Sequence, residues 1–102
     1  MKTNKFNSFS EFYPFYLSEH KKNLTKIYHM IGSLTVISLI IFSIYSTNYK
    51  YLCFTPIAGY GFAWYSHFFI ENNKPATFKY PLYSFIGDWI MFKDIITGKI
   101  KL

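Results

Sequence analysis

Residues 63–81, AWYSHFFIENNKPATFKYP, mark the point where an apolar, aromatic run ends and a polar loop begins. If residues 63–71 are helical, His67 and Glu71 stand at positions i and i+4 and lie on one face at the end of that helix. An imidazole and a carboxylate on one face can offer two ligands to a divalent metal. The alternative is that His67 caps a buried helix end while Glu71 is solvated, and the pair alone favours that alternative.

The composition favours a membrane protein of one domain, residues 1–102. Aromatic residues make up 24% of the chain, and charged residues only 16%, against roughly 25% in typical soluble domains. A soluble chain of this size has a large surface to cover and would struggle to do so with so few charges. Tyr and Trp also collect at the two interfaces of a lipid bilayer, which makes the bilayer the expected partner.

The charge of the chain is +6, carried by 11 lysines without any arginine. A basic chain suits nucleic acid or anionic lipid. Arginine is the preferred reader of bases and phosphates, so its absence argues against a nucleic-acid partner. The lysines also cluster beside the apolar segments, as expected at a membrane surface. Cys53 lies in an apolar run, and we expect it in the core.

The apolar segments predict an all-α fold. Residues 27–46 contain only His29 as a group that titrates near neutral pH, and residues 51–70 contain only His67. About 20 such residues can cross a hydrocarbon core of roughly 30 Å, and in lipid a helix is the only solution for a single segment. We therefore predict a small helical membrane protein with an N-terminal interfacial helix at 9–20, an antiparallel transmembrane hairpin of 24–47 and 51–71, and a C-terminal helix at 81–97.

The lysine distribution predicts the topology. The turn between the two apolar runs has only Lys50, whereas lysines flank both outer ends of the hairpin: Lys2, Lys5, Lys21, Lys22, Lys26, Lys74 and Lys79. Both hairpin ends should therefore face the cytoplasm, in a bacterial inner membrane or an endoplasmic reticulum membrane. The C-terminal segment carries Asp88, Lys93 and Asp94, which favours a helix partly embedded in the interface over a spanning one.

The three histidines of the chain should converge. His29 lies about 20 residues before the hairpin turn and His67 about 18 after it, so at 1.5 Å per residue their depths agree within about 3 Å. His20 lies near the same level, and it can reach the same ion as His29 only if the chain breaks between them, near Lys22-Asn23. Ionisable groups at a membrane are costly and are functional candidates. Three neutral imidazoles with a carboxylate suit Fe(II), Zn or Mn.

Four stretches of the chain together carry a specific pattern: FYPFYLSEHKKN (12–23), KIYHMIGS (26–33), GYGFAWYSHFFIENNKPATFKYPLYS (59–84) and GDWIMFKDIITGK (87–99). Two histidines in them follow the pattern H-x8-H, and the third opens H-x3-E-N-x-x-P-A-T-F. These stretches resemble the small membrane-protein family of fungal 2-hydroxy fatty acid dioxygenases. Two positions depart from the family pattern, with Lys26 in place of Arg and Ser66 in place of Gly.

The resemblance implies an Fe(II)- and O2-dependent α-oxidation that shortens a long-chain 2-hydroxy fatty acid by one carbon. It implies that His20, His29 and His67 hold the iron. Glu71 is then either a fourth ligand or a partner that orients His67, and Asp88 is either a similar outer partner or a helix cap. Lysines near the histidines would attract the substrate carboxylate, with Lys22 and Lys26 preferred over Lys21 and Lys74.

Two other functions stay open. A non-enzymatic membrane protein that binds lipid or acts as a scaffold would use the histidines structurally. A zinc-dependent lipid hydrolase would use the same three histidines without consuming O2.

Overall fold

A computed structural model describes residues 6–102, and every regular element in that range is helical. Lys2 and Lys5, which entered the topology prediction, lie outside the described residues. The four α-helices are α1 (Phe9–Ser18), α2 (Asn23–Ser46), α3 (Thr55–Ser66) and α4 (Pro81–Ile96). Three shorter segments connect them: the 3-10 turns η1 (Tyr49–Phe54) and η3 (Ala76–Phe78), and the π-helical turn η2 (His67–Glu71).

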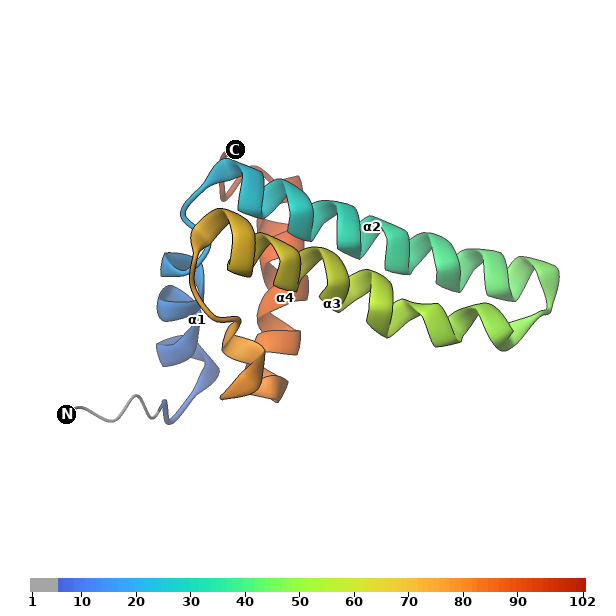
Figure 1. Cartoon of the computed structure of the whole chain (residues 1–102), viewed down its shortest axis with the longest axis horizontal. Helices are drawn as coiled ribbons and strands as arrows, with labels where there is room; N and C mark the ends of the chain where they lie inside the picture. The colour runs from blue at the N-terminus through green and yellow to red at the C-terminus, as the bar shows by residue number, and fades with distance from the viewer. Residues whose placement is uncertain (1–5) are drawn as a thin grey trace.

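Helices α2 and α3 run side by side in opposite directions and project from the rest of the molecule (Figure 1). The chain reverses at Thr47, which takes a left-handed conformation with φ of 54°. The two backbones approach closely at Gly32, where an added Cβ would lie 3.2 Å from the carbonyl oxygen of Ala58. Glycine therefore permits this contact, as small residues do between membrane helices.

Helices α1 and α4 pack against each other across the base of the α2–α3 pair (Figure 1). Their core consists of Phe12, Tyr16, Met91 and Ala76, with further aromatic rings packed around it. The ring of Tyr16 packs closely against the backbone of Gly87. A Cβ at position 87 would lie 3.3–3.4 Å from the ring carbons, so glycine leaves room for the ring. The C-terminal helix thus covers the histidine end of the pair and does not lie alongside it.

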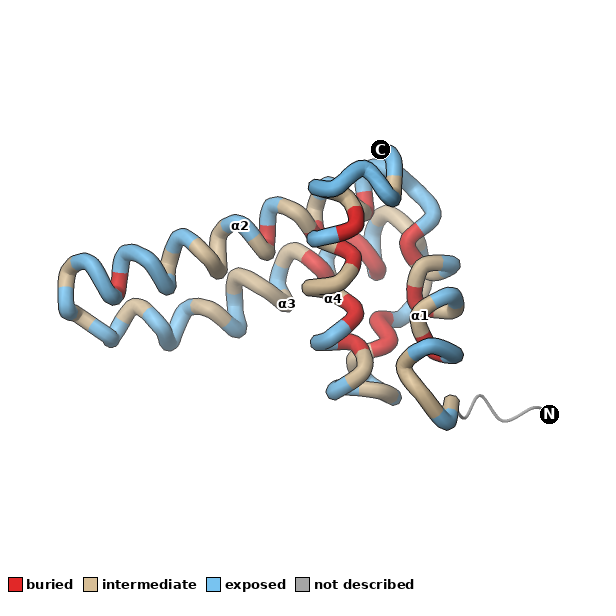
Figure 2. Tube along the Cα trace, turned by 180° about the vertical axis from the view of Figure 1, so that it is seen from behind, coloured by how far each residue is buried: buried red, intermediate tan, exposed pale blue. Residues whose placement is uncertain are grey.

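The outer part of the α2–α3 pair is apolar and exposed (Figure 2). Among the described residues, α2 is the one helix long and apolar enough to cross a membrane, with a mean hydropathy of 2.0. The predicted second span does not form one continuous α-helix, because Pro56 begins α3 in its first turn and the residues before and after take 3-10 and π geometry. Cys53 is exposed, so the expectation that it lies in a core is wrong.

Candidate metal centre

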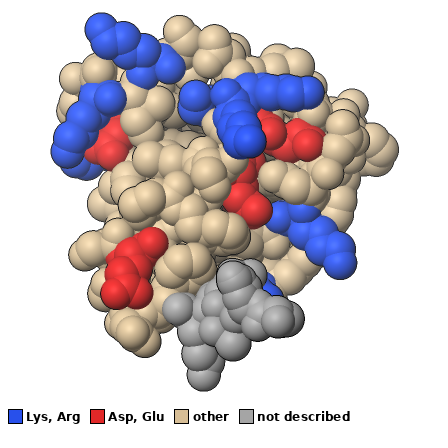
Figure 3. Space-filling view, turned by 90° about the vertical axis from the view of Figure 1, so that its left-hand side faces the viewer, with Lys and Arg blue, Asp and Glu red and all other residues tan. Residues whose placement is uncertain are grey.

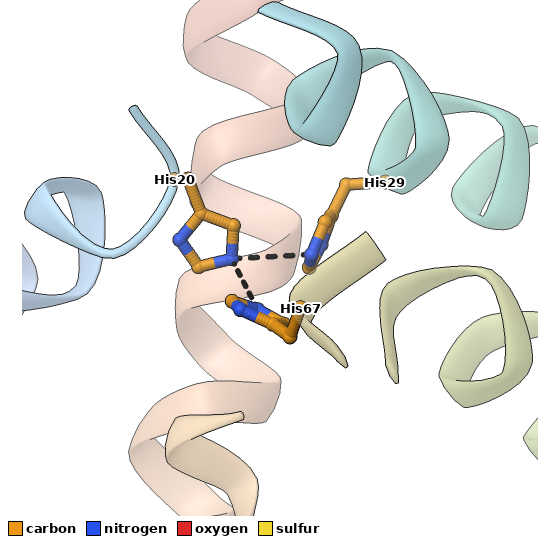
Figure 4. A group of neighbouring side chains, drawn as sticks. All are labelled: His20, His29 and His67. Carbon is orange, nitrogen blue, oxygen red and sulfur yellow. Dashed lines mark hydrogen bonds between the residues drawn. The ribbon is translucent and has the colours of Figure 1, made fainter. Parts of the chain in front are cut away.

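Three histidines meet at the base of the α2–α3 pair (Figure 4). The Nε2 atom of His20 lies 3.1 Å from Nε2 of His29 and 3.0 Å from Nε2 of His67. One ligand nitrogen from each ring falls within 4.8 Å of the other two, and all three side chains are buried. The structure therefore gathers three imidazoles on one point inside the protein.

Each histidine comes from a different place in the chain. His20 follows α1 in the short break before α2, His29 lies in the second turn of α2, and His67 stands where α3 passes into the π-helical turn. The break between His20 and His29 lets both rings face one point, as their nine-residue spacing requires. The π turn closes through a hydrogen bond from the Asn72 backbone N–H to the His67 carbonyl, and the Asn73 backbone N–H donates to the same carbonyl at 2.9 Å. Such turns within helices are frequent at functional sites.

The outer nitrogen of each ring faces an acceptor. Nδ1 of His20 lies 2.7 Å from the carbonyl oxygen of Tyr16, and Nδ1 of His67 lies 2.7 Å from Oδ1 of Asn73. Nδ1 of His29 lies 3.5 Å from a carboxylate oxygen of Asp88. Because these oxygens accept hydrogen bonds, the proton of each neutral ring belongs on Nδ1, and the Nε2 lone pair points inward.

This arrangement fits a divalent metal. Three neutral rings protonated on Nδ1 turn three bare Nε2 lone pairs toward one point, where a cation would bind all three. Two nitrogens about 2.1 Å from one ion lie about 3.0 Å apart at an N–metal–N angle of 90°, and about 3.4 Å apart in a tetrahedron. The distances of 3.0 and 3.1 Å lie close to the first value. Both distances therefore suit ligand nitrogens of one divalent ion, and the His29 and His67 nitrogens lie within 4.8 Å of each other.

A proton is a poor substitute for that cation at His20. Burial lowers the pKa of His20 well below its ordinary value, and the neighbouring imidazoles of His29 and His67 lower it further. The imidazole of His20 is therefore neutral at physiological pH and available as a ligand. Neutral imidazole is the form that binds metal.

Tyr16 connects His20 and His29, the first through its backbone carbonyl and the second through its side-chain hydroxyl and Asp88. Its backbone carbonyl accepts from His20, and its buried hydroxyl donates to the carboxylate of Asp88 that faces His29. Burial raises the pKa of Tyr16 well above its ordinary value, and the negative charge of Asp88 raises it further, so the hydroxyl stays protonated and remains a donor. Asp88, expected either to support the metal ligands or to cap a helix, thus lies beside His29.

Glu71 lies elsewhere. Its Oε2 accepts from the backbone N–H of Lys22 at 2.6 Å and from the hydroxyl of Thr25 at 2.8 Å. It thereby caps the start of α2 and ties η2 to that helix, outside the group of three histidine ligand atoms. The ammonium of Lys22 is also engaged, donating to the Ile70 carbonyl at 3.1 Å. Lys26 is half-buried, and its charge makes a small contribution to the lowered pKa of His20.

Two outer partners, Tyr16 and Asn73, are not among the candidate site residues named in the sequence analysis. A signal for Tyr16 is present, since it stands four residues before His20 and a carbonyl one helical turn earlier lies within reach of such a side chain. Asn73 is held by a second bond, from its Nδ2 to the Glu19 carbonyl at 3.2 Å, which fixes its amide oxygen toward His67. The rule that a metal-binding histidine needs an outer acceptor would direct attention to this loop.

The fold and the site define a small helical protein with three buried histidines that can hold a divalent metal. The chain belongs to the Mpo1-like family, since the family model described as 2-hydroxy-palmitic acid dioxygenase Mpo1-like matches residues 6–100. The match includes all three histidines and confirms the resemblance found in the sequence. The family name implies dioxygenase activity on a 2-hydroxy fatty acid. No curated protein and no solved structure matches the chain.

Proposed function

We propose that the protein is an Fe(II)-dependent dioxygenase that shortens a 2-hydroxy fatty acid by one carbon at a membrane surface. The observation that carries the proposal is the convergence of three histidine Nε2 atoms whose outer nitrogens are each held by an acceptor. Three histidine ligands that leave other positions of an ion free suit Fe(II) and O2 chemistry. Membership of the Mpo1-like family supports the choice of substrate.

The reaction balances with one O2 per acid. R–CH(OH)–COOH and O2 give R–COOH, CO2 and H2O; the bond between carbons 1 and 2 breaks, carbon 2 is oxidised to a carboxylate, and O2 takes up four electrons. Bound iron would supply the site at which O2 is activated and the 2-hydroxycarboxylate is held. His20, His29 and His67 would hold the iron, while Tyr16, Asp88 and Asn73 keep the three rings in the ligating tautomer.

The surface of the protein supports a membrane location. Both helices of the outer α2–α3 pair expose many large apolar side chains, and only 22% of the apolar window of α2 is buried within the protein. A core helix of a soluble protein would be mostly buried. Lysines are spread over the opposite end of the molecule (Figure 3). We propose that the pair inserts into the bilayer as a hairpin and that the histidine end lies at the headgroups on the cytoplasmic side.

The test is made on detergent-purified protein loaded with Fe(II) without oxygen and then given O2 and 2-hydroxyhexadecanoic acid. We expect one bound iron per chain, uptake of one O2 per acid and a product one carbon shorter. Protein loaded with Zn(II) is the control and should show neither uptake nor product. Bound iron without turnover would contradict the proposed substrate but leave the metal site.

Two further results would support the other functions. Hydrolysis of a lipid by the zinc-loaded protein without O2 uptake would establish the hydrolase. Folded protein that binds neither Fe(II) nor Zn(II), with histidine substitutions that change only its stability, would establish a structural role for the histidines.

A further inference from the structure

A pocket of about 170 Å³ opens beside the metal centre, between α2, α3 and α4. His29 and Asp88 belong to its lining, so one end of the pocket adjoins the histidine cluster. Ser33 and Val36 follow His29 along one stripe of α2, at spacings of four and seven residues. The pocket therefore runs from the metal centre toward the outer part of the α2–α3 pair.

Helices α3 and α4 form the other walls of the pocket. From α3 come Thr55, Pro56, Gly59 and Tyr60, and from α4 come Phe85 and Trp89 on the same face as Asp88. Most of these side chains are apolar or aromatic away from the histidine end. A ligand with a polar head at the histidines and an apolar chain directed along α2 matches this distribution.

We propose that this pocket binds the segment of the fatty acyl chain next to the carboxylate, and that Gly59 determines how much of the chain enters. The proposal rests on the proposed function for the identity of the head group. A cavity of about 150 Å³ can hold one benzene molecule, so this pocket takes about six carbons of the chain. The rest of a long chain lies along the exposed apolar surface of the outer hairpin, in the direction that a fatty acid takes in a bilayer leaflet.

Gly59 is the one glycine that lines the pocket, and a methyl group added there would cause little strain. A Cβ built there would lie 3.5 Å from Cγ2 of Val36, an ordinary contact, so substitution fills space without forcing the helices apart. Gly61 lies two residues further along α3, is exposed, does not line the pocket and has no atom within 4 Å of an added Cβ. It provides a control with the same chemical change on the same helix.

Trp89 provides a readout that does not depend on turnover. The chain has two tryptophans, and Trp64 is not part of the pocket lining, so Trp64→Phe leaves Trp89 as the one reporter. The probes are hexadecanoic acid brominated at carbon six and the same acid brominated at carbon fifteen, since bromine quenches tryptophan fluorescence only at short range. We expect strong quenching from carbon six and weak quenching from carbon fifteen.

Substitution at Gly59 should then weaken the quenching by the carbon-six probe. If Gly59→Leu displaces two methylenes from the pocket, at about fourfold in affinity for each, binding weakens about fifteenfold. Gly61→Leu should leave the affinity unchanged, and Gly59→Ala should give a smaller loss in case Gly59→Leu does not fold. Equal quenching by the two probes, or equal losses from the two leucine variants, would overturn the proposal.

A measurement of O2 uptake by the unmodified protein distinguishes failure of the pocket proposal from failure of the proposed dioxygenase reaction. Position-dependent quenching in a protein without dioxygenase activity leaves a fatty-acid pocket and removes the proposed reaction. Turnover of 2-hydroxyhexadecanoic acid without position-dependent quenching leaves the enzyme and removes the pocket.

Discussion

The two ends of the α2–α3 pair are built for different surroundings. At the base, His20 and Met91 are fully buried, and the interior combines an aromatic core with hydrogen-bonded polar groups. At the tip, Ile41 and Ile44 are each 61% exposed and Tyr45 is 87% exposed. The base has a buried core of its own, whereas the apolar surface of the tip is not covered by any described part of the chain. A single helix, α2, passes through both, so one half of it packs against the rest of the protein and the other half exposes apolar side chains.

The largest effect is expected at the base, from removal of a histidine. His67→Ala takes away one of three ligands from a buried site, so we expect loss of bound iron and loss of O2 uptake to below one hundredth of the original rate. Iron content and oxygen consumption measure this result, and circular dichroism shows whether the helices persist. Full iron binding by folded His67→Ala would contradict the assignment of His67 as a ligand.

The exposed middle of α2, between the base and the tip, should respond to charge. Leu34 is half exposed on α2 near the middle of the predicted span, and a lysine at the centre of a transmembrane helix costs about 2.5–3.5 kcal/mol. We expect Leu34→Lys to insert poorly and to lower stability in lipid vesicles, as measured by membrane flotation and by unfolding in a denaturing detergent. Tyr49→Lys at the turn, where the side chain is 59% exposed, is the matched control and should cost much less. Equal behaviour of the two variants would place the middle of α2 in water.

The spacing of the histidines in the sequence predicts much of their arrangement at the base of the α2–α3 pair. The rise of a helix places His29 and His67 at one depth, and the nine-residue gap between His20 and His29 demands a break in the chain; the structure contains both features. The apolar segments also predict an all-α fold, and every regular element of the described residues is helical. These properties depend on regular helical geometry, which a sequence expresses directly.

The outer partners of the histidines depend on irregular geometry. Regular α-helix through residue 71 would place Glu71 on the face of His67, but η2 is a π turn with wider spacing, and Asn72 is left-handed with φ of 62°. Asn73 therefore reaches His67, and Glu71 turns to the start of α2. The crossing of α4 over the base similarly depends on the contact between Gly87 and the ring of Tyr16, which no periodicity reveals.

Loss of the Asn73 contact should weaken metal binding less than loss of one of the three histidines. Asn73→Ala removes the acceptor for Nδ1 of His67, and loss of such an outer partner weakens metal binding by about 10–100-fold. Asn73→Asp keeps an oxygen acceptor and should retain most of the affinity, which distinguishes a positioning role from a role in loop shape. Competition for Fe(II) with a chelator of known affinity measures both variants. Equal losses from Ala and Asp would show that the amide acts through the loop, by its bond to the Glu19 carbonyl.

The smallest effect tests how closely α2 and α3 pack between the two ends. An alanine Cβ at Gly32 would lie 3.2 Å from the Ala58 carbonyl oxygen and 3.4 Å from that of Gly59, and backbone atoms yield little. Overpacking costs about 1–3 kcal/mol, while the higher helix propensity of alanine offsets about 1 kcal/mol. Gly32→Ala should therefore lower the free energy of unfolding slightly.

Gly61→Ala is the matched substitution on the partner helix, because the added Cβ there meets open space. It gains the helix propensity without the clash, so it should raise the free energy of unfolding by up to about 1 kcal/mol. Unfolding of both variants in a denaturing detergent, followed by circular dichroism, measures the difference. If Gly32→Ala is as stable as Gly61→Ala, the two helices separate easily at Gly32. The metal centre would then owe its geometry to α1, α4 and the Glu71 contacts at the base, and the packing of the hairpin would contribute little to it.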